Sequence, residues 1–206
     1  MGLQTFVKIG NISNLSDARY CAGMMADILG FNLEEGTEGF MSLDKFKEIT
    51  EWVAGVAFCG EFKNAHINEI KLAIQNYPLD FIEIQDIEQL EELAESEIKI
   101  IFKINIESKA DLVGLKQQYE LAEGIAEKVI ISSENDELFD PIQEEISRLN
   151  RSLPVLCGFG INEKTAASIV SDELFSGIEL VGTPEERPGY KDYGLVMDVL
   201  EVIEED

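Results

Sequence analysis

A single pattern repeats along the whole chain: a short apolar run rich in β-branched residues, then a turn, then a stretch whose apolar residues have helical spacing. The strand-like runs are Phe6–Ile9, Ala26–Phe31, Val53–Cys59, Phe81–Ile84, Lys99–Ile104, Lys128–Ile131, Val155–Gly158 and Gly177–Val181. The helical stretches are Leu15–Ala22, Leu43–Trp52, Asn64–Asn76, Ile87–Ala94, Lys109–Glu123, Pro141–Leu149, Glu163–Ser171 and Gly194–Glu204. Strands separated by helices run parallel, because each crossover returns the chain to the same end of the sheet.

Eight repeats in 206 residues give about 26 residues each, which is near the length of one strand–helix unit. The sequence therefore predicts a single domain, residues 1–206, folded as an α/β protein with a parallel eight-stranded (β/α)8 TIM barrel. The competing architecture is an open, doubly wound sheet. It is disfavoured because no GxGxxG motif follows the first strand-like run and no linker or change in composition marks a second domain.

The charge balance excludes several classes of partner. Sixteen Lys and Arg residues stand against 41 Asp and Glu residues, so the net charge is −25. A protein this acidic repels phosphodiester backbones and anionic lipid headgroups, and we expect neither nucleic acid nor a membrane as a partner. The three cysteines match neither a disulfide framework nor a zinc site, and no apolar stretch approaches 18 residues. We therefore expect a cytoplasmic protein that binds no metal.

Glycine-rich turns follow the last two strand-like runs, at the end of a parallel barrel where active sites lie. Residues 157–162 read CGFGIN and residues 180–184 read LVGTP. Glycine lets backbone amides approach a ligand closely, and a helix N-terminus favours an anion, so a phosphate can bind here without a lysine. Asn162 is also the expected N-cap of the helix that follows. The predicted phosphate site consists of Gly158, Phe159, Gly160, Asn162, Val181, Gly182 and Thr183.

Several segments, in order along the chain, resemble the phosphoribosylanthranilate isomerase family. Residues 7–18, VKIGNISNLSDA, are similar to the family motif VKICGITNxxDA, and residues 26–31, ADILGF, to GADAVGFVF. Residues 183–192, TPEERPGYKD, look like SSGVExxPGxKD, and residues 55–58 and Lys103 fit the third and fifth strands. The resemblance implies the same short barrel and a cytoplasmic enzyme of tryptophan biosynthesis. It also implies a monomer or homodimer that needs no cofactor.

The reaction that this resemblance implies is the Amadori isomerisation of N-(5'-phosphoribosyl)anthranilate, an intramolecular oxidoreduction of the aldose–ketose type. In the family a carboxylic acid protonates the furanose oxygen, and a thiolate then removes the proton from C2. The resemblance places the base at Gly10 and the acid at Ser132. Glycine has no proton-transferring atom and a serine hydroxyl is a very weak acid. We therefore expect the family reaction to be impaired or redirected.

Other departures from the family pattern lie at the same end of the barrel. The family's QLHG is replaced by residues 83–86, EIQD, and its substrate-carboxylate arginine falls near Gly39. We expect Lys8, Asn11, Gln85 and Ser133 to line the substrate pocket.

Four charged residues have a place in this interpretation. Lys8 lies two residues before Gly10 on the same predicted strand, so both face the same side of the sheet and Lys8 should point into the barrel. There Glu83 or Glu179 would neutralise its charge in a structural ion pair. Glu83 and Lys103 are weak candidates for a replacement acid or base, although the plainer interpretation of Glu83 is a solvated carboxylate.

The alternative function is that of a non-catalytic relative that binds a phosphorylated ligand in a regulatory or unknown role.

Overall fold

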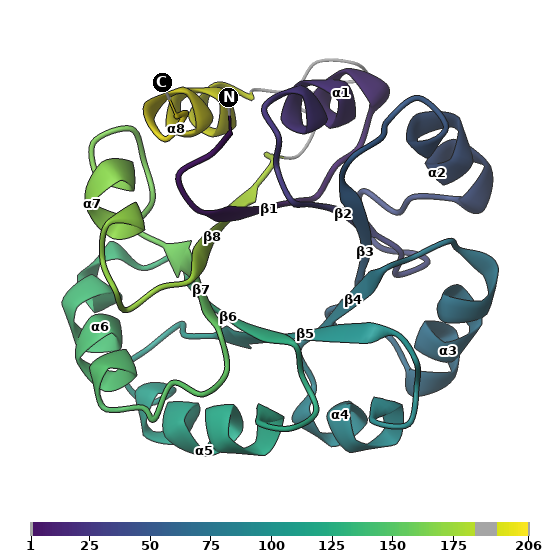
Figure 1. The fold of residues 1–206 in the computed structure, drawn as a ribbon. Helices are drawn as coiled ribbons and strands as arrows, with labels where there is room; N and C mark the ends of the chain where they lie inside the picture. Colours follow the sequence, from purple (N-terminus) through teal and green to yellow (C-terminus); the bar gives the residue numbers. More distant parts are fainter. Residues whose placement is uncertain (1, 184–192, 206) are drawn as a thin grey trace.

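The computed structural model of the protein describes residues 2–183 and 193–205. Eight parallel strands close into a barrel in sequence order, with β8 paired to β1 (Figure 1). The strands are β1 (Phe6–Gly10), β2 (Ile28–Asn32), β3 (Ala57–Glu61), β4 (Phe81–Ile84), β5 (Lys99–Asn105), β6 (Lys128–Ser133), β7 (Val155–Phe159) and β8 (Gly177–Val181). The predicted TIM barrel is confirmed, and the open sheet is excluded.

One α-helix follows each strand on the outside of the barrel (Figure 1). The helices are α1 (Leu15–Gly23), α2 (Leu43–Thr50), α3 (Ile67–Asn76), α4 (Ile87–Leu93), α5 (Leu112–Ala122), α6 (Phe139–Ser147), α7 (Ala166–Val170) and α8 (Gly194–Val202), with a 3-10 helix η1 (Asp136–Leu138) before α6. None of the described helices is long and apolar enough to cross a bilayer.

Side-chain caps fix the starts of the first four helices. Asn14, Ser42 and Asp86 each accept a hydrogen bond from a backbone amide of the first turn of α1, α2 and α4. His66 and Glu69 form a capping box at the start of α3. The single histidine of the chain therefore has a structural role on the outside of the barrel.

Helix α7 begins at Ala166, three residues later than the sequence predicts. The Thr165 hydroxyl accepts a hydrogen bond from the Asn162 amide at 2.9 Å and donates one to the Gly160 carbonyl at 2.7 Å. The Asn162 side chain accepts from the Lys164 amide at 3.0 Å, within the same turn. The prediction that Asn162 is the N-cap is therefore wrong, because this turn delays the helix and Thr165 occupies the cap position.

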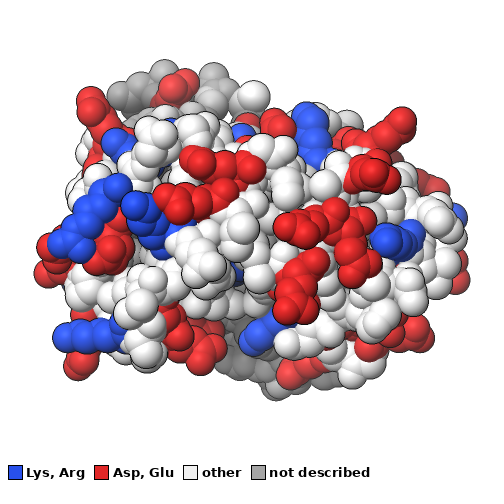
Figure 2. All heavy atoms as spheres, turned by 90° about the horizontal axis from the view of Figure 1, so that it is seen from below, with Lys and Arg blue, Asp and Glu red and all other residues white. Residues whose placement is uncertain are grey.

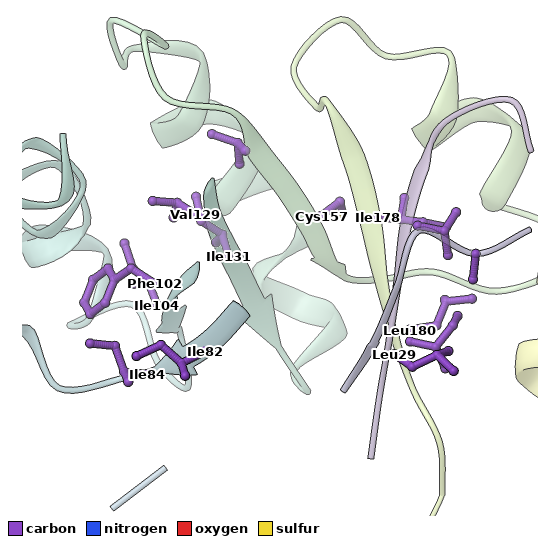
Figure 3. Packing of buried hydrophobic residues seen from close by; sticks show 14 of the residues in the cluster. Leu29, Ile82, Ile84, Phe102, Ile104, Val129, Ile131, Cys157, Ile178 and Leu180 are labelled. Carbon is purple, nitrogen blue, oxygen red and sulfur yellow. The ribbon is translucent and has the colours of Figure 1, made fainter. Parts of the chain in front are cut away.

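The outward-facing side chains of the strands pack against the ring of helices (Figure 3). This outer layer includes Leu29, Ile82, Ile84, Phe102, Ile104, Val129, Ile131, Cys157, Ile178 and Leu180, all of them nearly fully buried. Burial of this apolar surface is the main stabilising contribution of the barrel, since it is removed from water on both the sheet and the helix side.

The inward-facing side chains form two layers of opposite character. The lower layer, toward the amino ends of the strands, is apolar and consists of Ile28, Cys59, Phe81, Ile101, Ile130 and Leu156. The layer above it is charged and consists of Lys8, Glu61, Glu83, Lys103 and Glu179. We call these five residues the charged layer. The apolar layer closes the barrel from below, so the charged layer is the floor of any site at the carboxyl ends of the strands.

The outer surface carries the negative charge of the chain. On the face seen in Figure 2, acidic side chains are spread over the surface, and basic side chains lie singly or in small groups among them. Lys71 pairs with Glu92 at 3.7 Å and Lys116 with Glu120 at 3.6 Å, and all four side chains are exposed. An anionic ligand must therefore be held by local donors, because the overall field opposes it.

Candidate active site

A cavity of about 940 Å³ opens at the carboxyl ends of β4 to β8. A second cavity, of about 300 Å³, adjoins it over the ends of β1 to β4. Both cavities are lined by Lys63, Gln85, Lys103 and Val181. We call the two together the barrel mouth. It lies at the end of the barrel where active sites of this fold occur.

Most of the predicted phosphate residues line the larger cavity. They are Gly158, Phe159, Gly160, Val181, Gly182 and Thr183. The Phe159 ring is buried in edge contacts with Phe139 and Phe175, so this residue contributes backbone to the cavity. Asn162 is exposed and is not among the residues that line either cavity.

The loop after β7 offers backbone donors. Gly160 has a φ of +64°, and a β-carbon there would collide with the Phe139 ring, so the loop depends on glycine at this position. Among the hydrogen bonds of residues 2–183 and 193–205, none uses the amide of Gly160 or Ile161. The Gly182 amide, in contrast, donates to the Gly10 carbonyl at 3.0 Å. The available amides at the mouth therefore include those of the β7 loop.

Lys8 lies beneath the mouth, with no exposed surface. Its Nζ is 2.6 Å from Glu61 Oε1, 2.6 Å from Glu83 Oε2 and 2.8 Å from Glu179 Oε1. The expected ion pair is present with both predicted partners, and Glu61 is a third that the sequence did not indicate. These three carboxylates have oxygens within 4.8 Å of one another, and the Lys8 ammonium occupies the position between them that a cation would take.

Lys103 is the charged-layer cation that faces the cavities. It lines both cavities, its side chain is 13% exposed, and its Nζ is 2.6 Å from Glu179 Oε2 and 3.5 Å from Glu83 Oε1. The layer thus holds three carboxylates against two ammonium groups. One carboxylate has no full counter-charge, and burial makes that imbalance costly.

The carboxylate without a full counter-charge is Glu83 rather than Glu179. Burial raises the pKa of Glu83 to about 7, and the nearby Lys103 and Lys8 only partly oppose this shift. Glu179 is equally buried, but its close contacts with Lys8 and Lys103 lower its pKa to about 2. For Lys8, burial favours the neutral form, yet attraction by Glu179, Glu61 and Glu83 outweighs it and raises the pKa well above the usual value. Of Glu83 and Glu179, Glu83 is therefore the one that takes up a proton more readily.

The space at position 10, where the sequence resemblance places the base, is filled by another side chain. A β-carbon on Gly10 would lie 2.6 Å from Glu61 Oε1, and a β-carbon on Gly30 would also collide with the Glu61 carboxylate. The other carboxylate oxygen, Oε2, accepts a hydrogen bond from the Asn11 amide at 2.9 Å. Glycine at positions 10 and 30 is therefore what allows Glu61 to reach the centre of the barrel from β3.

Ser132, where the sequence resemblance places the acid, belongs to a chain of neutral hydrogen-bonding groups. The Ser132 hydroxyl donates to the Asn105 side-chain oxygen, and the Asn105 amide donates to Gln85 Oε1 at 2.6 Å. Ser132, Asn105 and Gln85 all line the larger cavity, together with Ser133. None of these side chains is an acid at neutral pH.

The sequence did not indicate several residues of the mouth, among them Glu61, Lys63 and Asn105. The alternation of side chains along a strand could have indicated Glu61, because it follows Cys59 by two residues and therefore faces the same side of the sheet. It was missed because the predicted strand ended at Cys59, whereas β3 extends to Glu61. Lys63 is placed by a tertiary contact, since the buried Glu34 carboxylate accepts hydrogen bonds from the amides of Lys63 and Asn64 at 2.8 and 2.9 Å. No local pattern indicates such a contact.

The sequence model of the family described as N-(5'phosphoribosyl)anthranilate (PRA) isomerase matches residues 7–202. The chain belongs to the PRA isomerase family. The family's reaction, from which it takes its name, is part of tryptophan biosynthesis. No curated protein matches the chain. Of the motif segment 183–192 that carries part of the resemblance, residues 184–192 lie outside the described residues.

Solved PRA isomerases share the fold of this chain. The enzyme from Thermotoga maritima superposes with a TM-score of 0.76 at 19% identity, over 97% of this chain and 98% of that one. A PRA isomerase in complex with reduced 1-(o-carboxyphenylamino)-1-deoxyribulose 5-phosphate gives 0.74 at 19% identity, over the same shares. A 3-hexulose-6-phosphate synthase gives 0.61 at 11% identity, over 96% and 99% of the two chains.

Proposed function

We propose that this member of the PRA isomerase family binds a phosphorylated sugar, with the phosphate at the loops after β7 and β8. The observation that carries the proposal is the cavity of about 940 Å³, which those two loops line with Gly158, Gly160 and Gly182. The amides of Gly160 and Ile161 face no other acceptor among the described residues, and Lys63 and Lys103 add positive charge nearby. These donors offset the repulsion expected from a net charge of −25.

We further propose that the family's isomerisation is impaired in this chain. Position 10 has no side chain, and Ser132 is part of a neutral hydrogen-bond chain. Neither Cys157 nor Cys59 offers a ready thiolate in place of the missing one: burial raises the pKa of Cys157 to about 12 and that of Cys59 well above its usual value. Opening a furanose ring needs a proton donor at the ring oxygen, and position 132 offers none of sufficient acidity.

Relatives of the same fold support the class of ligand. One PRA isomerase is known in complex with a deoxyribulose 5-phosphate derivative, and another relative is named for a hexulose 6-phosphate. Both names describe a phosphorylated ketose skeleton. The site proposed here takes the phosphate and leaves the sugar over the charged layer.

Isothermal titration of the full chain with inorganic phosphate and with ribulose 5-phosphate tests this proposal. Thr183→Asp places a carboxylate in the proposed phosphate site, and we expect it to weaken both affinities at least tenfold, which corresponds to about 1.4 kcal/mol. Asn150→Asp adds the same charge in the exposed loop between α6 and β7, at the opposite end of the barrel, and should leave both affinities unchanged. Equal affinities for the unmodified chain and Thr183→Asp would place the phosphate elsewhere.

A further inference from the structure

We propose that Glu61 is a general base that removes a proton from the carbon beside the carbonyl of an acyclic phosphorylated ketose, with the Lys103 ammonium holding the carbonyl oxygen. This inference rests on the proposed function, because the phosphate site must hold the substrate.

Glu61 is the most exposed carboxylate of the charged layer: its side chain is 16% exposed, against 4% for Glu83 and 1% for Glu179. Glu61 and Glu83 line the smaller cavity and Glu179 the larger one, but both oxygens of Glu179 are taken up by Lys8 and Lys103. Lys8 Nζ at 2.6 Å and the Asn11 amide at 2.9 Å hold the two oxygens of Glu61 in place. A carboxylate accepts about four hydrogen bonds, so lone pairs remain for a proton from the ligand.

Glu61 is joined to the proposed phosphate loop through two consecutive residues. The Gly10 carbonyl accepts from the Gly182 amide at 3.0 Å, and the Asn11 side chain donates to the Gly182 carbonyl at 2.9 Å. The Asn11 amide in turn donates to Glu61. A ligand whose phosphate lies at the loops after β7 and β8 therefore extends over Asn11 toward Glu61.

Lys103 supplies the positive charge that the carbonyl oxygen needs. It lines both cavities. Its Nζ lies 2.6 Å from Glu179 Oε2, and this contact fixes the position of the ammonium group. An ammonium group held in a partly buried site stabilises developing negative charge more strongly than it would in water.

The missing acid at position 132 determines which sugars can react. A cyclic sugar phosphate must first be opened by proton donation to its ring oxygen, and Ser132 cannot provide this. A ketopentose 5-phosphate is always open, because its C5 hydroxyl is esterified and cannot close a furanose ring. The substrate class that fits the site is therefore an acyclic ketose phosphate, for which ribulose 5-phosphate is the simplest probe.

The step is balanced without an oxidant, reductant or cofactor. The C1–H bond breaks, its proton goes to the Glu61 carboxylate, and its electron pair forms the C1–C2 double bond. The carbonyl π pair moves to oxygen, where Lys103 stabilises the enediolate. Return of a proton from Glu61 to C1 restores the ketose, and its return to C2, together with a proton transfer between the two oxygens, gives the aldose.

Proton exchange in D₂O tests this step directly. The full chain is incubated with ribulose 5-phosphate, and loss of the C1 proton signals is followed by NMR. We expect exchange well above the rate without protein, a fall of about a hundredfold or more in Glu61→Gln, and an affinity for ribulose 5-phosphate that stays within a few fold. Glu97→Gln, an exposed carboxylate at the amino end of β5, makes the same charge change outside the site and should keep the full rate.

The outcomes separate this inference from the proposed function. Binding of ribulose 5-phosphate without exchange above background overturns the inference and leaves the phosphate site standing. Exchange that persists in a folded Glu61→Gln variant also overturns it. If Glu61→Gln does not fold, Glu61→Asp keeps the charge but withdraws the carboxylate by one methylene, and an unchanged exchange rate in that variant overturns the inference too. Absence of binding by both phosphate and ribulose 5-phosphate overturns the proposed function itself.

Discussion

Oε1 of Glu61 lies 2.6 Å from the place that a β-carbon on Gly10 would occupy. A side chain from β3 therefore fills the space that the first strand leaves empty, two strands away around the barrel. The absence of a side chain at position 10 is thus what makes room for the carboxylate of Glu61. Restoring a side chain at position 10 without changing Glu61 forces the two groups into contact.

This relationship predicts coupled effects on stability. Gly10→Cys should lower the free energy of unfolding by about 1–3 kcal/mol, because it overpacks the centre of the barrel. In a Glu61→Ala background the same substitution should cost less, since the carboxylate is gone. Urea denaturation of the two single variants and the double variant measures the coupling, and we expect a coupling energy of about 0.5–3 kcal/mol in favour of the double variant. Strictly additive effects would contradict the contact.

Lys8→Met should be strongly destabilising. The substitution leaves the three carboxylates of the charged layer with Lys103 as their remaining cation in that layer, and breaking a buried ion pair by removing one partner typically costs about 3–5 kcal/mol. The loss should be smaller at pH 5 than at pH 8, because carboxylates that have lost their partner take up protons. Urea denaturation at both pH values measures this. Lys116→Met, which breaks an exposed pair with Glu120, serves as the control and should cost under about 0.5 kcal/mol.

Glu83 should make the folded protein less stable as the pH rises toward neutrality. Its pKa is raised from 4.5 to about 7 by burial, so between these values the folded state binds the proton that the unfolded state has released. The groups that face it are Lys8, Lys103, Glu61 and Glu179, with Cys59 below them.

Comparison with Glu83→Gln isolates this contribution, because glutamine does not titrate. The free energy of unfolding of Glu83→Gln minus that of the unmodified chain should increase from pH 5 to pH 8. A difference that stays constant over this range would show that Glu83 is already ionised at pH 5 in the folded protein.

Gly160→Ala should weaken anion binding and destabilise the fold. The residue has a φ of +64°, where a side chain is strained, and its β-carbon would meet the Phe139 ring. We expect a loss of about 1–3 kcal/mol in stability and at least a tenfold lower affinity for inorganic phosphate. Gly124 also has a positive φ but open space around it, so Gly124→Ala serves as the control. It should lower the free energy of unfolding through backbone strain and leave the affinity for phosphate unchanged.

The fold was predictable because every repeat carried the same two periodicities. The eight strands lie within a few residues of the predicted runs, and the differences follow from end effects. The strand at Ala57–Glu61 begins after Gly55 adopts a positive φ, and α7 starts late because Thr165 closes a turn with Asn162 and Gly160. Such ends depend on single hydrogen bonds that hydrophobic spacing does not encode.

The candidate site was predictable in part. Parity along β1 indicated that Lys8 points inward, and charge indicated Glu83 and Glu179 as its partners. The same reasoning missed Glu61. The predicted strand ended at Cys59, two residues before the true end of β3, so Glu61 was not considered as an inward-facing residue. The relation of Glu61 to Gly10 and Gly30 joins three strands and is visible only in the closed barrel.

The most direct measurement of the central claim is an assay of PRA isomerisation, followed by the loss of PRA fluorescence. We expect no turnover by the unmodified chain, and turnover by a Gly10→Cys/Ser132→Asp/Glu61→Ala variant that restores the family's base and acid and removes the side chain in their way. Turnover by the unmodified chain would contradict the claim that Gly10 and Ser132 impair the family reaction.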